Sequence, residues 1–384
     1  MVTVEVNCQS IEDSNLLLRA LWAECRETFS KCAWQYIPHR DGERGIVHFG
    51  FANIDMDTLL EVSVSYQRKG VIRSVMFEGV NGVINEELAS ELTQVVRRAF
   101  ERPLISHTIH AKINSTLLDI APYSSEHFVL MPLGKKENLF SLQVEGFDRV
   151  DAEAESLKFL GAILDFLAVC TNSAFVVRSL VVDNGELIPN VEPAFFSDDF
   201  DWIDESPADE KGRFLLWANQ KEFIEKILSK EILMAHPFLR ASYHFHAAQT
   251  LLKSATARER VLNDIAIVLF MSALEVGTEL YPFEPSHCDA CGQPIYAIRQ
   301  RVLDLARKFT NAQIVQFIDA FYSQRSKFLH AGFLSTDANY VGTSIPQLDP
   351  SSSTGCRMQV SIPPIVLGER VGFILRKVYM ERIA

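Results

Sequence analysis

The chain has 384 residues, of which 48% are hydrophobic and 22% are charged, and this composition excludes a disordered chain. Its net charge of −12 is uneven, because residues 230–384 carry 16 Lys and Arg against 13 Asp and Glu, whereas residues 1–229 carry 21 against 36. Neutralising phosphate requires clustered Lys and Arg, so the second half is the better candidate for binding nucleic acid, and the acidic excess of the first half also serves solubility.

The first 180 or so residues alternate between strand-like and helix-like segments. Helical periodicity is present at 15–29, 85–100 and 152–169, and Asn85 is a candidate helix start. Runs rich in Val, Ile and Phe, bounded by Gly, Pro, Asn and Asp, predict strands at 45–51, 59–66, 71–77, 106–113, 128–132, 140–147 and 175–182. The pattern therefore predicts an α+β domain over residues 1–196, without fixing its topology.

The clearest change in composition is the segment 197–212, in which seven of the sixteen residues are Asp or Glu. A charge run of this kind is typical of a linker or a solvated loop. After it, helical periodicity predicts a run of helices at 214–228, 240–252, 258–281, 295–309, 312–330 and 366–382. Helices joined by short loops indicate a bundle, so we expect an all-α domain over residues 213–384.

Targeting and cysteine patterns favour the cytoplasm. The seven cysteines are odd in number and scattered, and the first residues lack a basic start followed by an apolar core. The longest mainly apolar run, 265–274, is too short to span a bilayer. We therefore expect a cytoplasmic protein without membrane contact. Sequence signatures of nucleotide-binding loops and of serine or zinc hydrolases are absent, so no nucleotide cofactor is expected.

The predicted helix 312–330 carries the strongest chemical signal. Arg325 falls on the same face as the apolar Ile318 and Phe321, where a guanidinium requires a carboxylate, a phosphate or an interface. His330 follows five residues later, and Gly332 is a candidate C-cap. The pattern R-x4-H is weak by itself, since Arg102 and His107 match it in a segment that is predicted to be a strand.

Three segments in order strengthen this signal. Residues 322–332 read YSQRSKFLHAG, residues 269–275 read LFMSALE, and residues 295–302 read IYAIRQRV, with a terminal helix at 366–382. Over about residues 235–384 these segments resemble the HEPN domain family, most closely its Apea-like branch. The resemblance departs from many HEPN nucleases at Ser326, where Asn, Asp or His is frequent, and at Ala331, where Gly is frequent.

The resemblance implies an endoribonuclease that uses no metal and acts as a homodimer or higher oligomer through the C-terminal bundle. The resemblance implies that Arg325 and His330 are catalytic and that Ser326 and Lys327 are supporting residues of the same site. Members of this kind resemble prokaryotic defence or toxin effectors, with a front domain that senses a trigger. The chemistry is reasonable for these residue types, because RNA carries its own 2′-OH nucleophile, His transfers protons near neutral pH and Arg offers forked donors to phosphate. A five-residue spacing separates the pair by about 140° on a helix, which favours a second copy.

Alternatives remain open for this site. Glu275 interrupts an apolar helix, and we expect it either to pair with Arg325 and orient it or to face solvent. Arg325 and His330 either cut RNA or belong to a non-catalytic HEPN module that dimerises or binds RNA or a protein. His244 and His246 lie on another predicted helix, where packing is the default interpretation.

A third hypothesis is a structural zinc site. Cys288 and Cys291 form a single C-x-x-C with His287 before it, in a loop between two predicted helices. Zinc usually takes four ligands, and the chain has no second C-x-x-C, so these residues would need His287, another ligand or a second copy. A redox role lacks the setting of a thioredoxin-like fold. The primary expectation is no cofactor.

Overall fold

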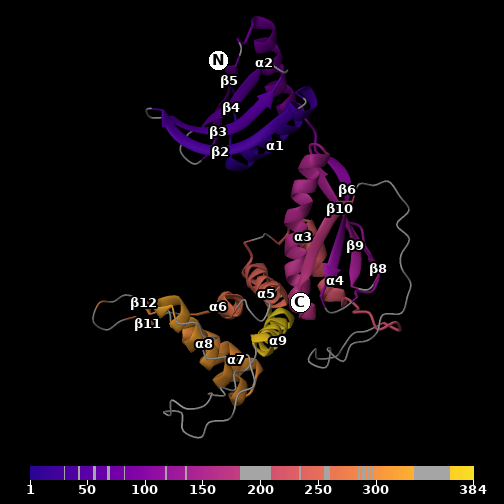
Figure 1. Cartoon of the computed structure of the whole chain (residues 1–384), viewed down its shortest axis with the longest axis vertical. Coiled ribbons are helices and arrows are strands. Elements are labelled where there is room, and N and C mark those ends of the chain that lie inside the picture. The colour runs from indigo at the N-terminus through magenta and orange to yellow at the C-terminus, as the bar shows by residue number, and fades with distance from the viewer. Residues whose placement is uncertain are drawn as a thin grey trace, which may run out of the picture. The chain divides into compact units, whose positions relative to one another are not determined.

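The computed structural model describes residues 1–29, 31–41, 44–54, 58–66, 70–81, 83–116, 119–134, 136–181, 209–232, 235–254, 260–283, 286–287, 291, 294–295, 297–332 and 364–384. The chain forms two compact units (Figure 1). Unit 1 comprises Met1–His107 and Gln143–Glu155, and unit 2 comprises Thr108–Leu142 and Ser156–Ala384.

Unit 1 is a five-stranded antiparallel sheet with two helices. The sheet order is β1-β5-β4-β3-β2. Its elements are β1 (Val2–Glu5), α1 (Ile11–Thr28), β2 (Lys31–Asp41), β3 (Arg44–Asn53), β4 (Leu59–Tyr66), β5 (Ile72–Asn81) and α2 (Glu86–Glu101). The helices begin at side-chain caps, Ser10 for α1 and Asn85 for α2, which satisfy amide groups of the first turn.

One hydrophobic core joins the helices of unit 1 to its sheet. Fully buried side chains include Trp22 of α1, Leu92 of α2 and Phe77 of β5. Charged pairs attach the segment 143–155 to α1, since Arg19 bonds Asp151 in a bidentate manner at 2.9 Å. This arrangement buries the apolar faces that the sequence periodicity predicts.

Unit 2 combines the second antiparallel sheet with the helices. The sheet order is β10-β6-β9-β8-β7. Its strands are β6 (Ile105–Ser115), β7 (Tyr123–Ser124), β8 (Phe128–Gly134), β9 (Glu137–Gly146) and β10 (Phe175–Val181), and α3 (Arg149–Thr171) lies between β9 and β10 in sequence. β6, β9 and α3 each have part of their length in unit 1.

The helical part of unit 2 follows residue 217. It contains α4 (Ala218–Leu228), α5 (Pro237–Ser254), α6 (Arg260–Gly277), the 3-10 turn η2 (Thr278–Leu280), the short strands β11 (Ser286–His287) and β12 (Pro294–Ile295), α7 (Ile298–Phe309), α8 (Ala312–Ala331) and α9 (Pro364–Arg382). The helix α6 packs against α5, α7, α8 and α9. An α+β first part followed by helices is therefore confirmed at this level.

Close approach between helices depends on two glycines of α9. A Cβ at Gly368 would lie 2.8 Å from Cζ of Phe270. A Cβ at Gly372 would overlap the side chain of Asn172 and lie 3.0 Å from Cζ of Phe245. These glycines allow α9 to pack against α5 and α6 without displacing buried rings.

The second sheet and the helices share one unit, so the grouping differs from a division at 197–212. His246 of α5 bonds Asp165 of α3 at 2.7 Å and accepts the N–H of Phe175 at 2.9 Å. The rings of Phe166, Phe223 and Tyr379 also join α3, α4 and α9, with centroids 4.6–5.5 Å apart. Residues 197–208 of the predicted linker lie outside the described residues. Within the described part, no helix combines the length and hydropathy needed to cross a bilayer.

Candidate functional site

The helix α8 presents the sequence-predicted site on its last two turns. The Asn311 side chain caps its first turn by accepting the N–H of Ile314, and Gly332 ends it at φ 67° with its N–H donating to the carbonyl of Phe328. The left-handed C-cap agrees with the sequence prediction. Buried Val315, Ile318 and Phe321 hold α8 against its neighbours.

Arg325 is held by a carboxylate and a phenol ring. Its Nη2 donates to Oε2 of Glu275 at 3.0 Å, and the two side chains are 20% and 18% exposed. Tyr322, one turn earlier on α8, donates its hydroxyl to the other carboxylate oxygen at 2.7 Å. The Arg325 Cζ atom lies 5.4 Å from the centre of the Tyr322 ring. The contact predicted between Glu275 and Arg325 is therefore present, and Tyr322 completes it.

The environment of Tyr322 keeps its hydroxyl protonated. Burial, and then the hydrogen bond to Glu275, raise the pKa of Tyr322 to about 12, so the phenol stays a neutral donor at neutral pH. The Nε of Arg325 is buried and has no hydrogen-bond partner among the described residues. An unsatisfied buried donor of a charged group lowers the stability of the fold.

His330 differs from Arg325 in its environment. Its side chain is exposed at the end of α8, as is that of Lys327, while Ser326 is half-buried. Among the described residues His330 makes no hydrogen bond to Arg325. The structure thus brings Arg325, Glu275 and Tyr322 together and leaves His330 open to solvent or to another molecule.

Sequence reasoning assigned no role to Tyr322, although its position three residues before Arg325 on one helix face was available as a signal. It also gave His244 only a packing role. His244 of α5 is half-buried, and burial together with Arg240 lowers its pKa, while the charge of Glu275 acts in the opposite direction. Its Nδ1 is buried without a partner in the described part of the chain. His246, by contrast, is fully engaged in joining α5 to α3 and β10.

The zinc hypothesis falls largely on residues that are not described. Cys288 and the side chain of His287 lie outside the described residues, and Cys291 is an exposed free cysteine. Among the residues that are described, no group of three or more His, Cys, Asp or Glu side chains could hold a metal ion.

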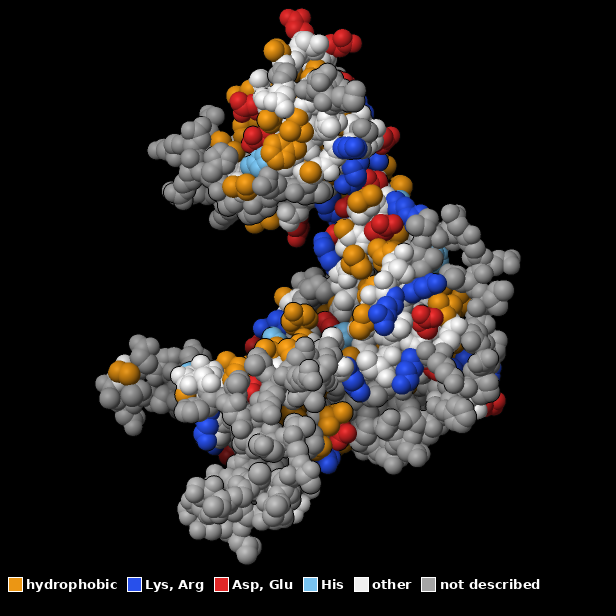
Figure 2. Space-filling model, viewed as in Figure 1, with side chains coloured by type: hydrophobic (Ala, Val, Ile, Leu, Met, Phe, Trp, Pro, Cys, Tyr) orange, Lys and Arg blue, Asp and Glu red, His pale blue; other side chains and the backbone are white. Residues whose placement is uncertain are grey.

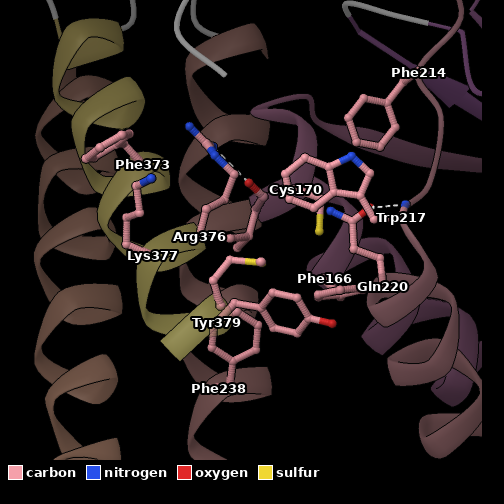
Figure 3. A pocket seen from close by; sticks show the side chains of 12 residues that line it. Phe166, Cys170, Phe214, Trp217, Gln220, Phe238, Phe373, Arg376, Lys377 and Tyr379 are labelled. Atoms are coloured by element: carbon pink, nitrogen blue, oxygen red, sulfur yellow. Dashed lines mark hydrogen bonds between the residues drawn. The ribbon is translucent and has the colours of Figure 1, made fainter. Parts of the chain in front are cut away.

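A pocket of about 540 Å³, partly open to solvent, lies where α3, α4, α5 and α9 meet (Figure 3). Aromatic side chains line it, among them Phe166, Trp217 and Tyr379. The Nη1 of Arg376 donates to the carbonyl of Val169 at 3.0 Å, and complete burial raises the pKa of the Cys170 thiol. We interpret the pocket as a gap in the packing of this junction, because its polar groups serve the fold.

The face drawn in Figure 2 shows Lys and Arg side chains interspersed with Asp and Glu over the described residues. Charge on this face therefore does not single out one binding surface. Comparisons of the chain with models of protein families, with curated proteins and with solved structures find no match.

Proposed function

We propose that the chain is a metal-independent endoribonuclease of HEPN type that acts as a dimer. The observation that carries the proposal is the guanidinium of Arg325, held by Glu275 at 3.0 Å and by the Tyr322 ring, five residues before an exposed His330. A guanidinium held in a fixed orientation binds a phosphate without reorganising in the transition state. A role as a defence or toxin effector rests on the sequence resemblance alone.

The proposed reaction needs only groups that RNA and the chain supply. The 2′-OH attacks the adjacent phosphorus, the bond from phosphorus to the 5′ oxygen breaks, and the products are a 2′,3′-cyclic phosphate and a 5′-hydroxyl. One His330 accepts the proton of the 2′-OH, and a second donates a proton to the leaving 5′ oxygen. Arg325 stabilises the charge on the phosphorus oxygens. No water or metal ion is consumed.

A dimer would supply what one chain lacks. On an ideal helix the five-residue spacing turns His330 about 140° away from Arg325, so one α8 is poorly suited to direct both groups at one phosphate. A two-fold axis beside α8 would bring two Arg325 and two His330 side chains together. The exposure of His330 supports this arrangement.

The second candidate is a non-catalytic HEPN module that dimerises or binds RNA or a protein. The observation that favours it is the same ion pair, since Glu275 offsets much of the charge that Arg325 would offer to phosphate. Zinc bound by Cys288 and Cys291 remains a separate proposal, and metal analysis of the purified protein tests it.

Cleavage of a mixed panel of single-stranded and structured RNAs in EDTA tests the main proposal. We expect the wild type to cut and the His330→Ala and Arg325→Ala variants to lose activity. Arg299→Ala is the matched control, because it removes an exposed Arg that pairs with Asp319 of α8. If the wild type does not cut but forms dimers that bind RNA, the non-catalytic module is correct. Equal cutting by wild type and His330→Ala would remove His330 from the mechanism.

A further inference from the structure

A groove of about 660 Å³ lies between η2, the residues that follow it and α7. We call it the Tyr281 groove, and its lining includes Thr278, Tyr281, Phe283, Arg301, Asp304 and Lys308. Phe283 is 37% exposed, a large proportion for an aromatic side chain.

A Lys or Arg side chain lies over each aromatic ring of the groove. The Lys308 Nζ lies 4.5 Å from the centre of the Tyr281 ring, and the Arg382 Cζ lies 5.0 Å from it. The Arg301 Cζ lies 4.6 Å from the centre of the Phe283 ring. In each pair the cation is attracted to the face of the ring, and Phe283, which is 37% exposed, keeps ring surface on which a base can stack.

The charge balance around the groove is positive. Glu381 pairs with Lys308 and accepts the Tyr281 hydroxyl at 3.5 Å, and Asp304 pairs with Arg307. Among the described residues that line the groove or pair with its lining, four cations stand against these two carboxylates, namely Arg301, Arg307, Lys308 and Arg382. Two positive charges therefore remain beside two aromatic rings, which favours an anionic ligand with flat apolar faces.

A nucleotide has this chemistry, because its base stacks on aromatic rings and its phosphate binds cations. In single-stranded RNA the base faces are accessible, whereas in a duplex they are covered by neighbouring pairs. Sequence-independent single-strand binding by other proteins uses the same combination of aromatic platforms and a basic groove.

Thr278 connects the groove to Glu275, which binds Arg325. The Thr278 hydroxyl donates to the carbonyl of Glu275 at 2.6 Å, and the Thr278 carbonyl accepts Nη2 of Arg301 at 3.1 Å. Five residues of α6 and η2 lie between Glu275 and Tyr281, which separates them by on the order of 10 Å along the helix axis.

We infer that the Tyr281 groove binds one or two nucleotides of single-stranded RNA that flank the phosphate held at Arg325. This inference rests on the proposed function for its link to cleavage, whereas binding by the groove is measurable without cleavage. A free mononucleotide shares the ligand chemistry, so the test separates the two sources.

Fluorescence anisotropy of the full-length protein with a labelled 15-nucleotide oligouridine in EDTA tests binding. We expect Phe283→Ala and Tyr281→Ala each to weaken binding about tenfold, the loss expected for one stacked base. Tyr281→Phe and Phe283→Tyr keep the rings and retain affinity. Phe100→Ala is the matched control, since Phe100 of unit 1 is 49% exposed and lies outside the groove.

Three outcomes would overturn the inference: unchanged affinity in both alanine variants, equal binding of duplex RNA, or binding of uridine monophosphate without binding of the oligomer. Cleavage kinetics separate this inference from the nuclease proposal. In an active enzyme the groove variants raise KM for the 15-mer and leave kcat nearly unchanged. If no variant cuts RNA but the alanine variants still lose affinity, the groove assignment stands and the nuclease proposal fails.

Discussion

Removal of either member of the Glu275–Arg325 pair should destabilise the helical part of unit 2. The side chains are about four-fifths buried and their atoms lie 3.0 Å apart. Hydrogen bonds to charged groups stabilise a fold by about 1.5–3 kcal/mol, and leaving a partner unsatisfied adds to the cost. We therefore expect Glu275→Ala, which also orphans the Tyr322 hydroxyl, to cost about 2–3 kcal/mol and the double-mutant coupling energy to be about 1.5 kcal/mol.

The assay is amide hydrogen exchange of α6 and α8 in the wild type, the two single variants and the double variant. This measurement reports local opening, so unfolding of unit 1 does not enter it. The pair of Arg299 and Asp319 is the control, because it is bidentate at 2.8 Å but 55% and 35% exposed. Its coupling should be much smaller and should fall with added salt.

A coupling near zero for Glu275 and Arg325 would contradict a stabilising contact between them. So would a coupling that salt weakens as strongly as it weakens the control pair, because the partly buried pair should be screened less. Either result would mean that Arg325 keeps its position without the carboxylate, and that Glu275 has no positioning role.

Three further predictions concern the same unit. Tyr322→Phe should reduce the loss of stability at alkaline pH, because the fold raises the pKa of the Tyr322 phenol from 10.0 to about 12. The protonated phenol stabilises the fold fully below pH 10, and this contribution is lost as the pH rises towards 12. Urea unfolding of both proteins between pH 9 and 12 measures the difference. Gly332→Ala should cost about 1–2 kcal/mol by thermal unfolding, since φ is 67° although a Cβ there meets nothing within 4 Å. Gly372→Ala should lower the stability by about 3 kcal/mol or more, because the new Cβ would overlap the side chain of Asn172. Its control is Gly161→Ala on the exposed face of α3, where a Cβ meets nothing within 4 Å; this change should stabilise the protein by about 0.5–1 kcal/mol in the same assay.

Elements with strong local signals could be predicted from the sequence. The helix expected at 312–330 is α8 (Ala312–Ala331), and the strand expected at 59–66 is β4 (Leu59–Tyr66). Helical periodicity, side-chain caps and alternating apolar residues act over a few neighbours, so a single sequence contains them.

Elements that depend on distant partners were missed. The strand β1 has four residues and gains its hydrogen bonds from β5, some seventy residues later. The edge strand β2 includes Pro38, which lowers its strand signal. The contact of α5 with the second sheet depends on His246 and the N–H of Phe175 in β10, 71 residues apart, and no local pattern indicates such a pairing.

The sequence could predict the part of the candidate site in which a charged group on an apolar helix face needs an oppositely charged partner. A carboxylate in the apolar helix α6 and a guanidinium on the apolar stripe of α8 both require compensation, and they compensate each other. The role of His330 rests on the motif, because an exposed histidine at a helix end needs no partner within the chain.

The ion pair leads to a prediction that separates a catalytic role for Arg325 from mere packing. Glu275 lowers the positive charge offered to phosphate and at the same time fixes the guanidinium. Glu275→Gln keeps an acceptor for Tyr322 but removes the charge, so RNA binding should tighten. Cleavage should slow, on the order of 10–100-fold, because a small misplacement of a catalytic group is costly. If affinity and cleavage rate instead fall together or do not change, Glu275 does not position Arg325 for catalysis.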